Sequence, residues 1–250
     1  MRHDKIMSRY DYKPYYRRNL PHLQPLGANL FVTCCLEGAI PQSALDWYRR
    51  EKERFIVQSA RMPSDRAKAE LELQRRWFVH MEAALHKSET GPTWLKDKRV
   101  AKLVADALHF HDAKKYRLDA YSIMSNHAHL VFAPLELSEK SDETETEPPG
   151  EKRDPEYYSL AKILHSIKSF TGHKANEILQ REGHFWQHES YDHSIRDHQE
   201  WERVVAYVVN NPVKAGLVEQ WRDWPFSYRR QIVRGAFVSI ALLMIAYGIV

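Results

Sequence analysis

The sequence has little cysteine and no apolar leader, and each absence restricts what the chain can be. Its only two cysteines, Cys34 and Cys35, are adjacent. Neighbouring cysteines rarely bridge each other, so a disulfide framework is excluded and a reducing cytoplasm is the expected location. The chain begins Met-Arg-His-Asp-Lys, which lacks the apolar segment of a signal peptide.

Long uncharged runs are also scarce, apart from the sixteen residues 235–250 at the C-terminus. A membrane span usually needs about 17–25 apolar residues, so a membrane role is not expected. We expect this apolar tail to pack against the domain or a partner. A tail anchor and a non-native end of the reading frame are the alternatives.

The composition is that of an ordinary globular domain, but the charge is unevenly spread. Hydrophobic residues make up 43% and charged residues 28% of the 250 residues, enough for one domain with a substantial core. The net charge is +4, yet residues 136–156 hold nine acidic and three basic residues, which leaves about +10 elsewhere. Such a basic body favours a polyanion such as nucleic acid. A merely solubilising surface is the alternative.

The pattern along the chain predicts an α+β fold. Residues 1–27 are basic, aromatic and proline-containing, which is typical of an extended arm, and the domain then runs over 28–234. We expect strands at 29–36, 116–124 and 127–133, and a strand or ribbon at 185–195. Helices are expected at 98–110, 160–179 and 197–210, with two more in 42–87. The helical insertion therefore covers about 42–112. Strands and helices do not strictly alternate, so a doubly wound fold is not predicted.

The acidic stretch of about 136–156 is rich in Ser, Thr, Glu and Pro and contains no aromatic residue. This composition predicts a disordered loop on the surface. A solvated insertion is the favoured reading, and a DNA mimic or autoinhibitory flap is the alternative.

His127 and His129 form the most informative short pattern in the chain. They lie in an apolar, β-rich run, and side chains two apart on a strand share one face. Both imidazoles would therefore point the same way, as a metal site requires. Two polar residues on the solvent face of a strand would give the same pattern.

The helix 197–210 offers possible partners for this pair. At about 100° per residue, Trp201, Val204, Val205 and Val208 form a buried stripe. Tyr207 and Asn211 lie together on one flank of that stripe, one turn apart. A tyrosine at the edge of the core is commonly packing, and an asparagine before a proline is commonly a cap, so both structural readings stay open.

Five further blocks accompany these residues in order. Met-Ser-Asn-His-Ala-His-Leu at 124–130 resembles the histidine signature of the HUH single-tyrosine transposases, with Ser125 in place of the usual proline. The other blocks resemble those of the REP-associated branch of that family, and they lie at 20–24 with 31–33, 164–171, 183–197, 207–218 and 223–227. The resemblance spans roughly residues 17–228. The acidic insertion and the apolar tail lie outside it.

The resemblance implies a fold, a reaction and a set of site residues. The fold would be a palm-like, ferredoxin- or RRM-like antiparallel sheet flanked by helices, with the histidines on a central strand and the tyrosine on a facing helix. His127, His129 and Asn211 would bind a divalent cation, Mg²⁺ or Mn²⁺, and Tyr207 would be the nucleophile. The enzyme would cleave and transfer single-stranded DNA at hairpins or repeat palindromes through a 5′-phosphotyrosine.

Contacts to DNA are expected from basic and aromatic residues of these blocks. The candidates are Arg17, Arg18, Lys168, Trp186, Arg196 and Lys214. Bases of single strands stack on aromatic rings for about 1–3 kcal/mol each, although Trp186 would serve equally well in the core. A second histidine cluster at His184, His188, His193 and His198 lacks cysteine partners, so solvent-facing or DNA-facing positions are favoured over zinc binding.

Two rival functions stay open at the level of sequence. One is a metal-dependent phosphoesterase that uses the histidine pair without a covalent intermediate. The other is a domesticated DNA-binding protein that has lost catalysis. The expected partner in each case is single-stranded or hairpin DNA or another phosphoester, while the choice between monomer and homodimer is left open.

Overall fold

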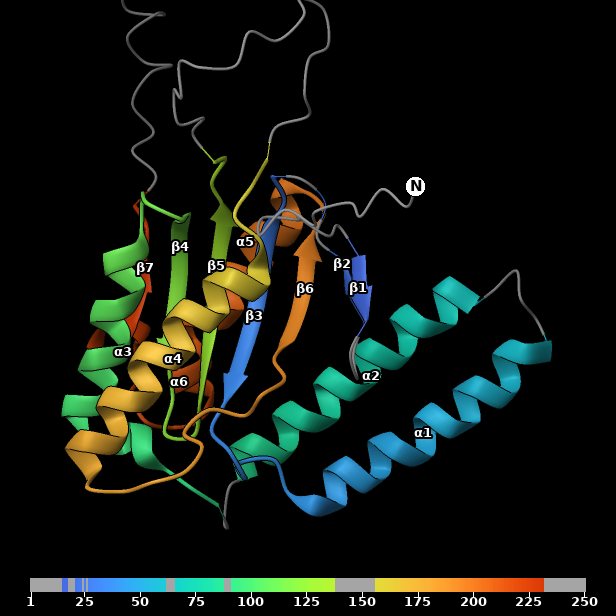
Figure 1. Ribbon diagram of the computed structural model, residues 1–250, viewed down its shortest axis with the longest axis horizontal. Coiled ribbons are helices and arrows are strands. Elements are labelled where there is room, and N and C mark those ends of the chain that lie inside the picture. Colours follow the sequence, from blue (N-terminus) through green and yellow to red (C-terminus); the bar gives the residue numbers. More distant parts are fainter. Residues whose placement is uncertain are drawn as a thin grey trace, which may run out of the picture.

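The computed structural model describes residues 15–17, 21–23, 25, 27–61, 66–87, 91–137 and 156–231 (Figure 1). In this part of the chain the main sheet has five strands in the order β6-β3-β5-β4-β7, and all neighbours are antiparallel. The strands are β3 (Asn29–Cys35), β4 (Tyr116–Ile123), β5 (His127–Pro134), β6 (Tyr191–Ile195) and β7 (Ser227–Arg229). The strand that carries both histidines is therefore the central one.

The order of elements gives the sheet a ferredoxin-like topology. β3, helix α3 (Lys98–His111), β4, β5, helix α4 (Leu160–Leu179) and β6 follow one another as β-α-β-β-α-β, apart from an insertion before α3. Helices α3 and α4 pack against each other and cover one face of the sheet (Figure 1). The expected antiparallel α+β fold is confirmed.

Local sequence signals account for the ends of these helices. Asp97 caps α3 by accepting a hydrogen bond from the backbone N–H of Arg99 at 2.9 Å. Ser159 caps α4 in the same way, and Gln180 closes it in a left-handed conformation with φ of 51°. β5 is buried along its whole length, as expected for the middle strand of a covered sheet.

Helices α1 (Gln42–Arg61) and α2 (Arg66–Lys87) form the insertion between β3 and α3. They run as an antiparallel pair beside the β6 side of the sheet (Figure 1). The apolar row Trp77, Met81 and Leu85 recurs every four residues on α2 and is buried in the core. This row fixes which side of α2 faces the sheet.

Helix α5 (His198–Val209) and the short α6 (Asn211–Lys214) lie on the opposite face from α3 and α4. The Asp197 side chain caps α5 by accepting from the N–H of Glu200 at 2.7 Å, as expected from the sequence. Trp201, Val205 and Val208 are buried against the sheet, whereas Val204 is only half-buried. Pro212 stands in the first turn of α6, and Gly216 follows it with a φ of 67°.

Residues 185–195 are strand only in their second half. Phe185 and Trp186 are both buried, at 3% and 7% exposure, although consecutive strand residues would point to opposite faces. Both residues instead pack against Gly172 of α4, where an added Cβ would lie 3.4 Å from Cβ of Phe185 and 3.6 Å from Cδ1 of Trp186. The strand β6 begins only at Tyr191.

Two short segments near the N-terminus pair as β1 (Tyr15–Arg17) and β2 (Pro21–Leu23). The N–H of Leu137 donates to the Glu156 carbonyl at 2.6 Å, so the chain returns close to where it left. The remainder of the acidic stretch, residues 138–155, and the apolar tail lie outside the described residues. Within the described ranges, we find no helix that is long and apolar enough to cross a membrane.

Candidate metal and tyrosine site

His127 and His129 lie side by side on β5 and face the side of the sheet that α5 covers. Their Nε2 atoms are 3.1 Å apart, and the two side chains are 1% and 0% exposed. The shared face that the i, i+2 spacing predicts is therefore confirmed, and the alternative of two solvent-facing residues is excluded.

Neighbouring residues fix the orientation of each imidazole. The Asn126 amide nitrogen donates to the carbonyl of Leu85 at 3.1 Å, which leaves its Oδ1 facing His127 Nδ1 at 2.7 Å. Because that oxygen can only accept, Nδ1 carries the proton and Nε2 presents a lone pair. His129 Nδ1 lies 2.9 Å from the Thr33 hydroxyl. Such outer partners are typical of histidines that bind metals.

Burial keeps His127 neutral. It lowers the pKa of the imidazole to about 3, and the neighbouring charge of His129 acts in the same direction. A neutral imidazole with a fixed tautomer is the form that can donate its Nε2 lone pair to a metal ion.

The third member of the group is Glu82 of α2, which sequence reasoning missed. Its Oε2 lies 3.3 Å from His129 Nε2, and the residue is 7% exposed. One ligand atom from each of Glu82, His127 and His129 falls within 4.8 Å of the others, so the group could hold a metal ion. Glu82 follows Phe78 by four residues on the row next to the apolar row of α2. Because α2 is rich in Arg and Glu, this carboxylate carries no distinct signal in the sequence.

The Glu82 carboxylate stays ionised despite its burial. Burial alone would raise its pKa, but the charge and hydrogen bond of His129 and the hydroxyl of Tyr207 bring the pKa below the ordinary range. A buried anion that faces two imidazoles is the donor set that suits a divalent cation.

Tyr207 reaches the same group from α5. Its hydroxyl donates a short hydrogen bond to Glu82 Oε2, and its ring lies 5.6 Å from the His129 ring. Burial raises the pKa of this phenol, and the Glu82 charge raises it further. The hydroxyl is therefore held in its protonated form in the metal-free protein. The fold thus brings Tyr207 across to the face that carries the histidines.

Asn211 is fully buried beside this group, at 0% exposure. An interaction with its side chain lowers the pKa of the Tyr207 hydroxyl against the larger effects of burial and Glu82, although the two groups form no hydrogen bond of normal geometry. Neither its oxygen nor its nitrogen, nor Oε1 of Glu82, has a hydrogen-bond partner among the described residues. Buried polar atoms without partners are unfavourable by about 1–3 kcal/mol each, and a ligand in the site would satisfy them. The oxygens of Glu82 and Asn211 therefore fit a bound cation, whereas the amide nitrogen of Asn211 is a donor and requires an acceptor.

Two basic side chains lie near the site on its more open side. The ammonium of Lys214, which is exposed, lies 4.3 Å from the centre of the Tyr207 ring. His86, one turn after Glu82 on α2, places its Nε2 3.8 Å from the Glu82 carboxylate. Lys214 therefore makes positive charge available beside Tyr207, whereas burial lowers the pKa of His86 below its ordinary value and favours its neutral form.

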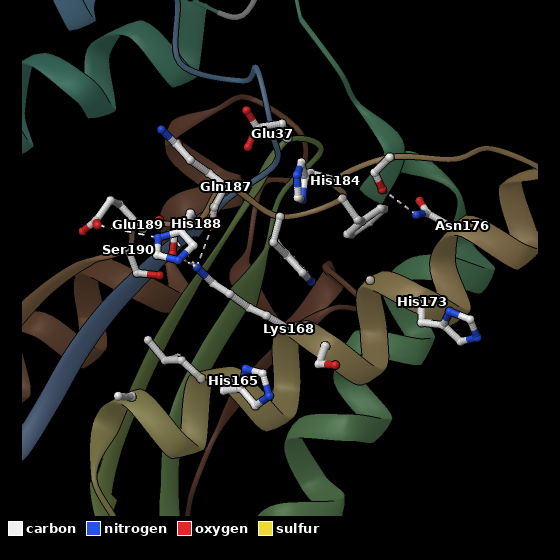
Figure 2. A pocket seen from close by; sticks show the side chains of 17 residues that line it. Glu37, His165, Lys168, His173, Asn176, His184, Gln187, His188, Glu189 and Ser190 are labelled. Carbon is white, nitrogen blue, oxygen red and sulfur yellow. Dashed lines mark hydrogen bonds and ion pairs between the residues drawn. The ribbon is translucent and has the colours of Figure 1, made fainter. Parts of the chain in front are cut away.

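The other residues expected to contact DNA lie away from this group. Lys168 of α4 lies in a pocket where its ammonium donates to the carbonyls of Gln187, His188 and Glu189 at 2.8, 3.3 and 3.5 Å (Figure 2). Its donors are thus already used within the fold. Arg196 is exposed but paired with Glu200 at 3.1 Å.

Trp186 lies in the core, and its indole N–H donates to the Thr171 hydroxyl at 2.8 Å. With 7% exposure, its ring has little surface for a base unless the segment moves. Of the two roles considered for Trp186, its position in the fold is that of a core residue. Arg18 and the side chain of Arg17 lie outside the described residues.

The second histidine cluster is dispersed. His193 pairs with Glu200 at 3.0 Å and His198 stacks on Trp201, while His184 and His188 line the pocket of Figure 2. Over the described ranges, these histidines form no group with three metal-ligating residues.

Fold and site together define a class of protein: a ferredoxin-like α+β domain in which two strand histidines, a helix carboxylate and a helix tyrosine meet. By sequence, the chain is similar to REP-associated tyrosine transposases over part of its length. It is 42% identical to the REP-associated tyrosine transposase of Escherichia coli K12 over 53 residues, which are 21% of this chain and 32% of that protein. The expected family resemblance is confirmed.

A Haemophilus influenzae protein assigned to the same class is 43% identical over 116 residues, or 43% of this chain and 56% of the relative. The chain therefore spans about a third to just over half of these relatives. A solved structure of a REP-associated tyrosine transposase bound to a REP hairpin aligns with 85% of this chain and 80% of its own, with a TM-score of 0.45 and 17% identity. No protein-family model matches the chain.

Proposed function

We propose that the chain is a metal-dependent endonuclease and strand transferase that cleaves single-stranded DNA and holds it as a 5′-phosphotyrosine on Tyr207. The observation that carries this proposal is the hydrogen bond from the Tyr207 hydroxyl to Glu82, a member of the buried group with His127 and His129. A phenol whose oxygen borders a metal-type site is placed for attack on a phosphodiester bound there. The sequence relatives support DNA as the substrate.

Glu82, His127 and His129 would hold the cation, and Asn211 remains a candidate for a further oxygen ligand. Imidazole nitrogen suits Mn²⁺ better than Mg²⁺, so Mn²⁺ is the favoured ion of the two. A bound divalent cation would withdraw charge from the phosphate oxygens and stabilise the charge that develops during the reaction.

The protein residues carry the covalent step. Oη of Tyr207 attacks phosphorus, the bond from phosphorus to the 3′ oxygen breaks, and the 3′ oxygen leaves as a hydroxyl once protonated. Glu82 Oε2 already accepts the hydrogen bond from the phenol, so a proton acceptor lies next to Oη. In the reverse direction, a 3′-hydroxyl attacks the phosphotyrosine and Tyr207 leaves. One residue therefore serves both cleavage and strand transfer.

Lys214 is the best placed of the expected DNA contacts. It lies over the Tyr207 ring and makes no ion pair within the described part of the chain. A lysine in this position would hold the scissile phosphate near Oη and favour the charged transition state. By the names of the relatives, hairpin or repeat-palindrome DNA is the proposed target.

The test is covalent capture of DNA. The protein is incubated with Mn²⁺ or Mg²⁺ and a pool of hairpin oligonucleotides with randomised single-stranded flanks, then run on a denaturing gel. An adduct that forms with the wild type, and that Tyr207→Phe and EDTA abolish, is the expected result. Cleavage without an adduct that persists in Tyr207→Phe would instead identify a phosphoesterase. Binding with neither cleavage nor adduct would identify a DNA-binding protein.

A further inference from the structure

A hollow of about 300 Å³ lies beside Tyr207, and its lining includes none of Glu82, His127 and His129. We call it the aromatic hollow, and its walls come from α2, β3, β6 and α5. It is lined by four aromatic rings and two arginines: Phe31, Phe78, Tyr191, Tyr207, Arg75 and Arg203. None of these residues except Tyr207 takes part in the proposed covalent step.

The rings form a continuous wall. Phe78 stacks on Tyr191 with ring centres 4.6 Å apart and an angle of 29° between the planes. Phe31 meets Phe78 edge to face at 5.5 Å, and Tyr207 closes the wall at 6.0 Å from Phe78. Phe31 and Tyr191 are buried, whereas Phe78 and Tyr207 are half-buried. The wall therefore presents part of its aromatic surface to the hollow.

Arg75 and Arg203 stand at the rim of the aromatic hollow, and both are exposed. In the described part of the chain, neither guanidinium forms a hydrogen bond or an ion pair. Their neighbours differ, because Arg76 pairs with Glu51 at 2.7 Å and Arg196 pairs with Glu200 at 3.1 Å. Two unpaired cations beside an aromatic wall complement a ligand that has a flat ring and a negative charge.

The hollow also contains a fixed polar pair. His193 Nε2 lies 3.0 Å from Glu200 Oε1, and both residues line the hollow. A carboxylate can accept from an amino group, and an imidazole can donate or accept according to its tautomer. These two groups could form hydrogen bonds with the polar edge of a base that enters the hollow.

We propose that the aromatic hollow receives the base of a single-stranded nucleotide adjacent to the phosphate that Tyr207 attacks, and that Arg75 and Arg203 bind its flanking phosphates. The proposal rests on the proposed function. Tyr207 joins the two places, because its hydroxyl contacts Glu82 while its ring borders the hollow. Stacking on aromatic rings with cations along the backbone is the usual chemistry of single-strand binding.

The hollow would then help to decide which phosphodiester is cleaved. A base seated against Phe78 fixes the position of the neighbouring phosphate relative to Tyr207. A duplex keeps its bases stacked and cannot supply one without unpairing, so the hollow would also select single-stranded DNA.

Binding can be tested without cleavage and without knowledge of the target. The protein carries Tyr207→Phe, which keeps the ring and removes the nucleophile, and the probe is a short thymidine oligonucleotide with one 5-iodouracil. After irradiation, mass spectrometry locates the cross-linked peptides. Cross-links at Phe78 or Tyr191 are expected. Cross-links confined to other surfaces, such as the pocket around Lys168, would overturn the proposal.

Affinity for the same oligonucleotide gives a second measure. Phe78→Ala should weaken binding about 5- to 150-fold, the range given by about 1–3 kcal/mol of stacking. Phe110→Ala is the control, because Phe110 is 62% exposed on α3, on the other face of the sheet. Phe78→Leu keeps the apolar bulk against Tyr191, and it should also bind more weakly while its thermal unfolding matches the wild type. Wild-type affinity in Phe78→Leu would contradict stacking.

The arginines are tested by salt dependence. Arg75→Gln and Arg203→Gln should each lower the slope of log affinity against log salt by about 0.7, the value for one phosphate contact in a single strand. Arg229→Gln, on the opposite edge strand β7, should leave the slope unchanged. Unchanged slopes in both test variants would contradict the assignment. If wild-type Tyr207 forms the DNA adduct but the cross-links lie outside the hollow, only the proposal for the hollow is rejected. If the cross-links lie in the hollow but no adduct forms, only the proposed reaction is rejected.

Discussion

The two faces of the central sheet satisfy their buried polar groups in opposite ways. On the face covered by α3 and α4, Tyr116 donates to the Leu108 carbonyl at 2.8 Å, and Lys168 donates to backbone carbonyls. On the face covered by α5, Glu82 and Asn211 leave buried atoms without partners among the described residues. The difference comes largely from the helices that cover the two faces, because Lys168 belongs to α4, Glu82 to α2 and Asn211 to α6.

This contrast separates a face that stabilises the fold from a face organised for a ligand. Each unsatisfied polar atom on the α5 face opposes folding by about 1–3 kcal/mol, which the apolar face must offset. Substitutions on the two faces should therefore move stability and activity independently.

The largest effect on activity is expected from His129→Ala. Loss of an outer-shell partner of a metal typically lowers affinity or activity about 10- to 100-fold, so loss of a proposed direct ligand should lower adduct formation by more than about 100-fold. His165→Ala, an exposed histidine on α4, serves as the control. If His129→Ala kept more than a tenth of the wild-type rate of adduct formation, the histidines on the α5 face would not take part in the reaction.

The apolar face should show the reverse pattern in Phe132→Ala. Phe132 is fully buried against Tyr116, with ring centres 4.9 Å apart. Its loss should lower the free energy of unfolding by about 3–5 kcal/mol, measured by urea denaturation. Adduct formation per folded molecule should persist below the melting temperature. A variant that keeps its stability but loses the adduct would contradict the separation of the two faces.

Asn211→Leu should raise stability while it lowers activity. The substitution replaces a buried amide without partners by an apolar side chain of similar size, so unfolding should require about 1–3 kcal/mol more. The same variant should form less adduct if the amide contacts the cation or the phosphate. A loss of stability would show that the amide is satisfied in solution, for instance by water.

The pH dependence of stability probes His127. The folded pKa is about 3, below the ordinary value of 6.5, so between these values the unfolded chain binds a proton that the folded chain does not. Stability is therefore full above about pH 6.5 and falls by about 1.4 kcal/mol per unit as the pH drops toward 3. His127→Gln should flatten this slope in the metal-free protein. If the free energy of unfolding fell equally steeply with pH in both proteins, a group other than His127 would be responsible for the pH dependence.

The elements with strong periodicity could be predicted from the sequence. Leu160, Ile163, Leu164 and Ile167 mark one face of α4, and the bounds of that helix match the expected ones. The segment before β6 could not be predicted, because Phe185 and Trp186 are both buried through contacts with distant residues, among them Gly172 of α4 and, for Phe185, the Trp94 ring. Contacts between residues far apart in the chain produce no periodic pattern of hydrophobic residues in the local sequence.

The candidate site was predictable in part for the same reason. Strand alternation places His127 and His129 on one face, and helical spacing puts Tyr207 at the edge of the core. Glu82 was missed because it lies in a helix rich in Arg and Glu, where a single carboxylate carries no distinct signal. Only the packing of α2 beside β6 and β3 brings it to the histidines. The role of Asn211 as a ligand stays a prediction.

The central claim is that Tyr207 is the residue that DNA becomes attached to. The most direct test digests the adduct with protease and nuclease and locates the remaining nucleotide by mass spectrometry, with Tyr207→Phe as the control. We expect a 5′-phosphonucleotide on the wild-type peptide that contains Tyr207 and none on the same peptide of Tyr207→Phe. A nucleotide on another residue, or cleaved DNA with unmodified Tyr207 throughout the time course, would contradict it.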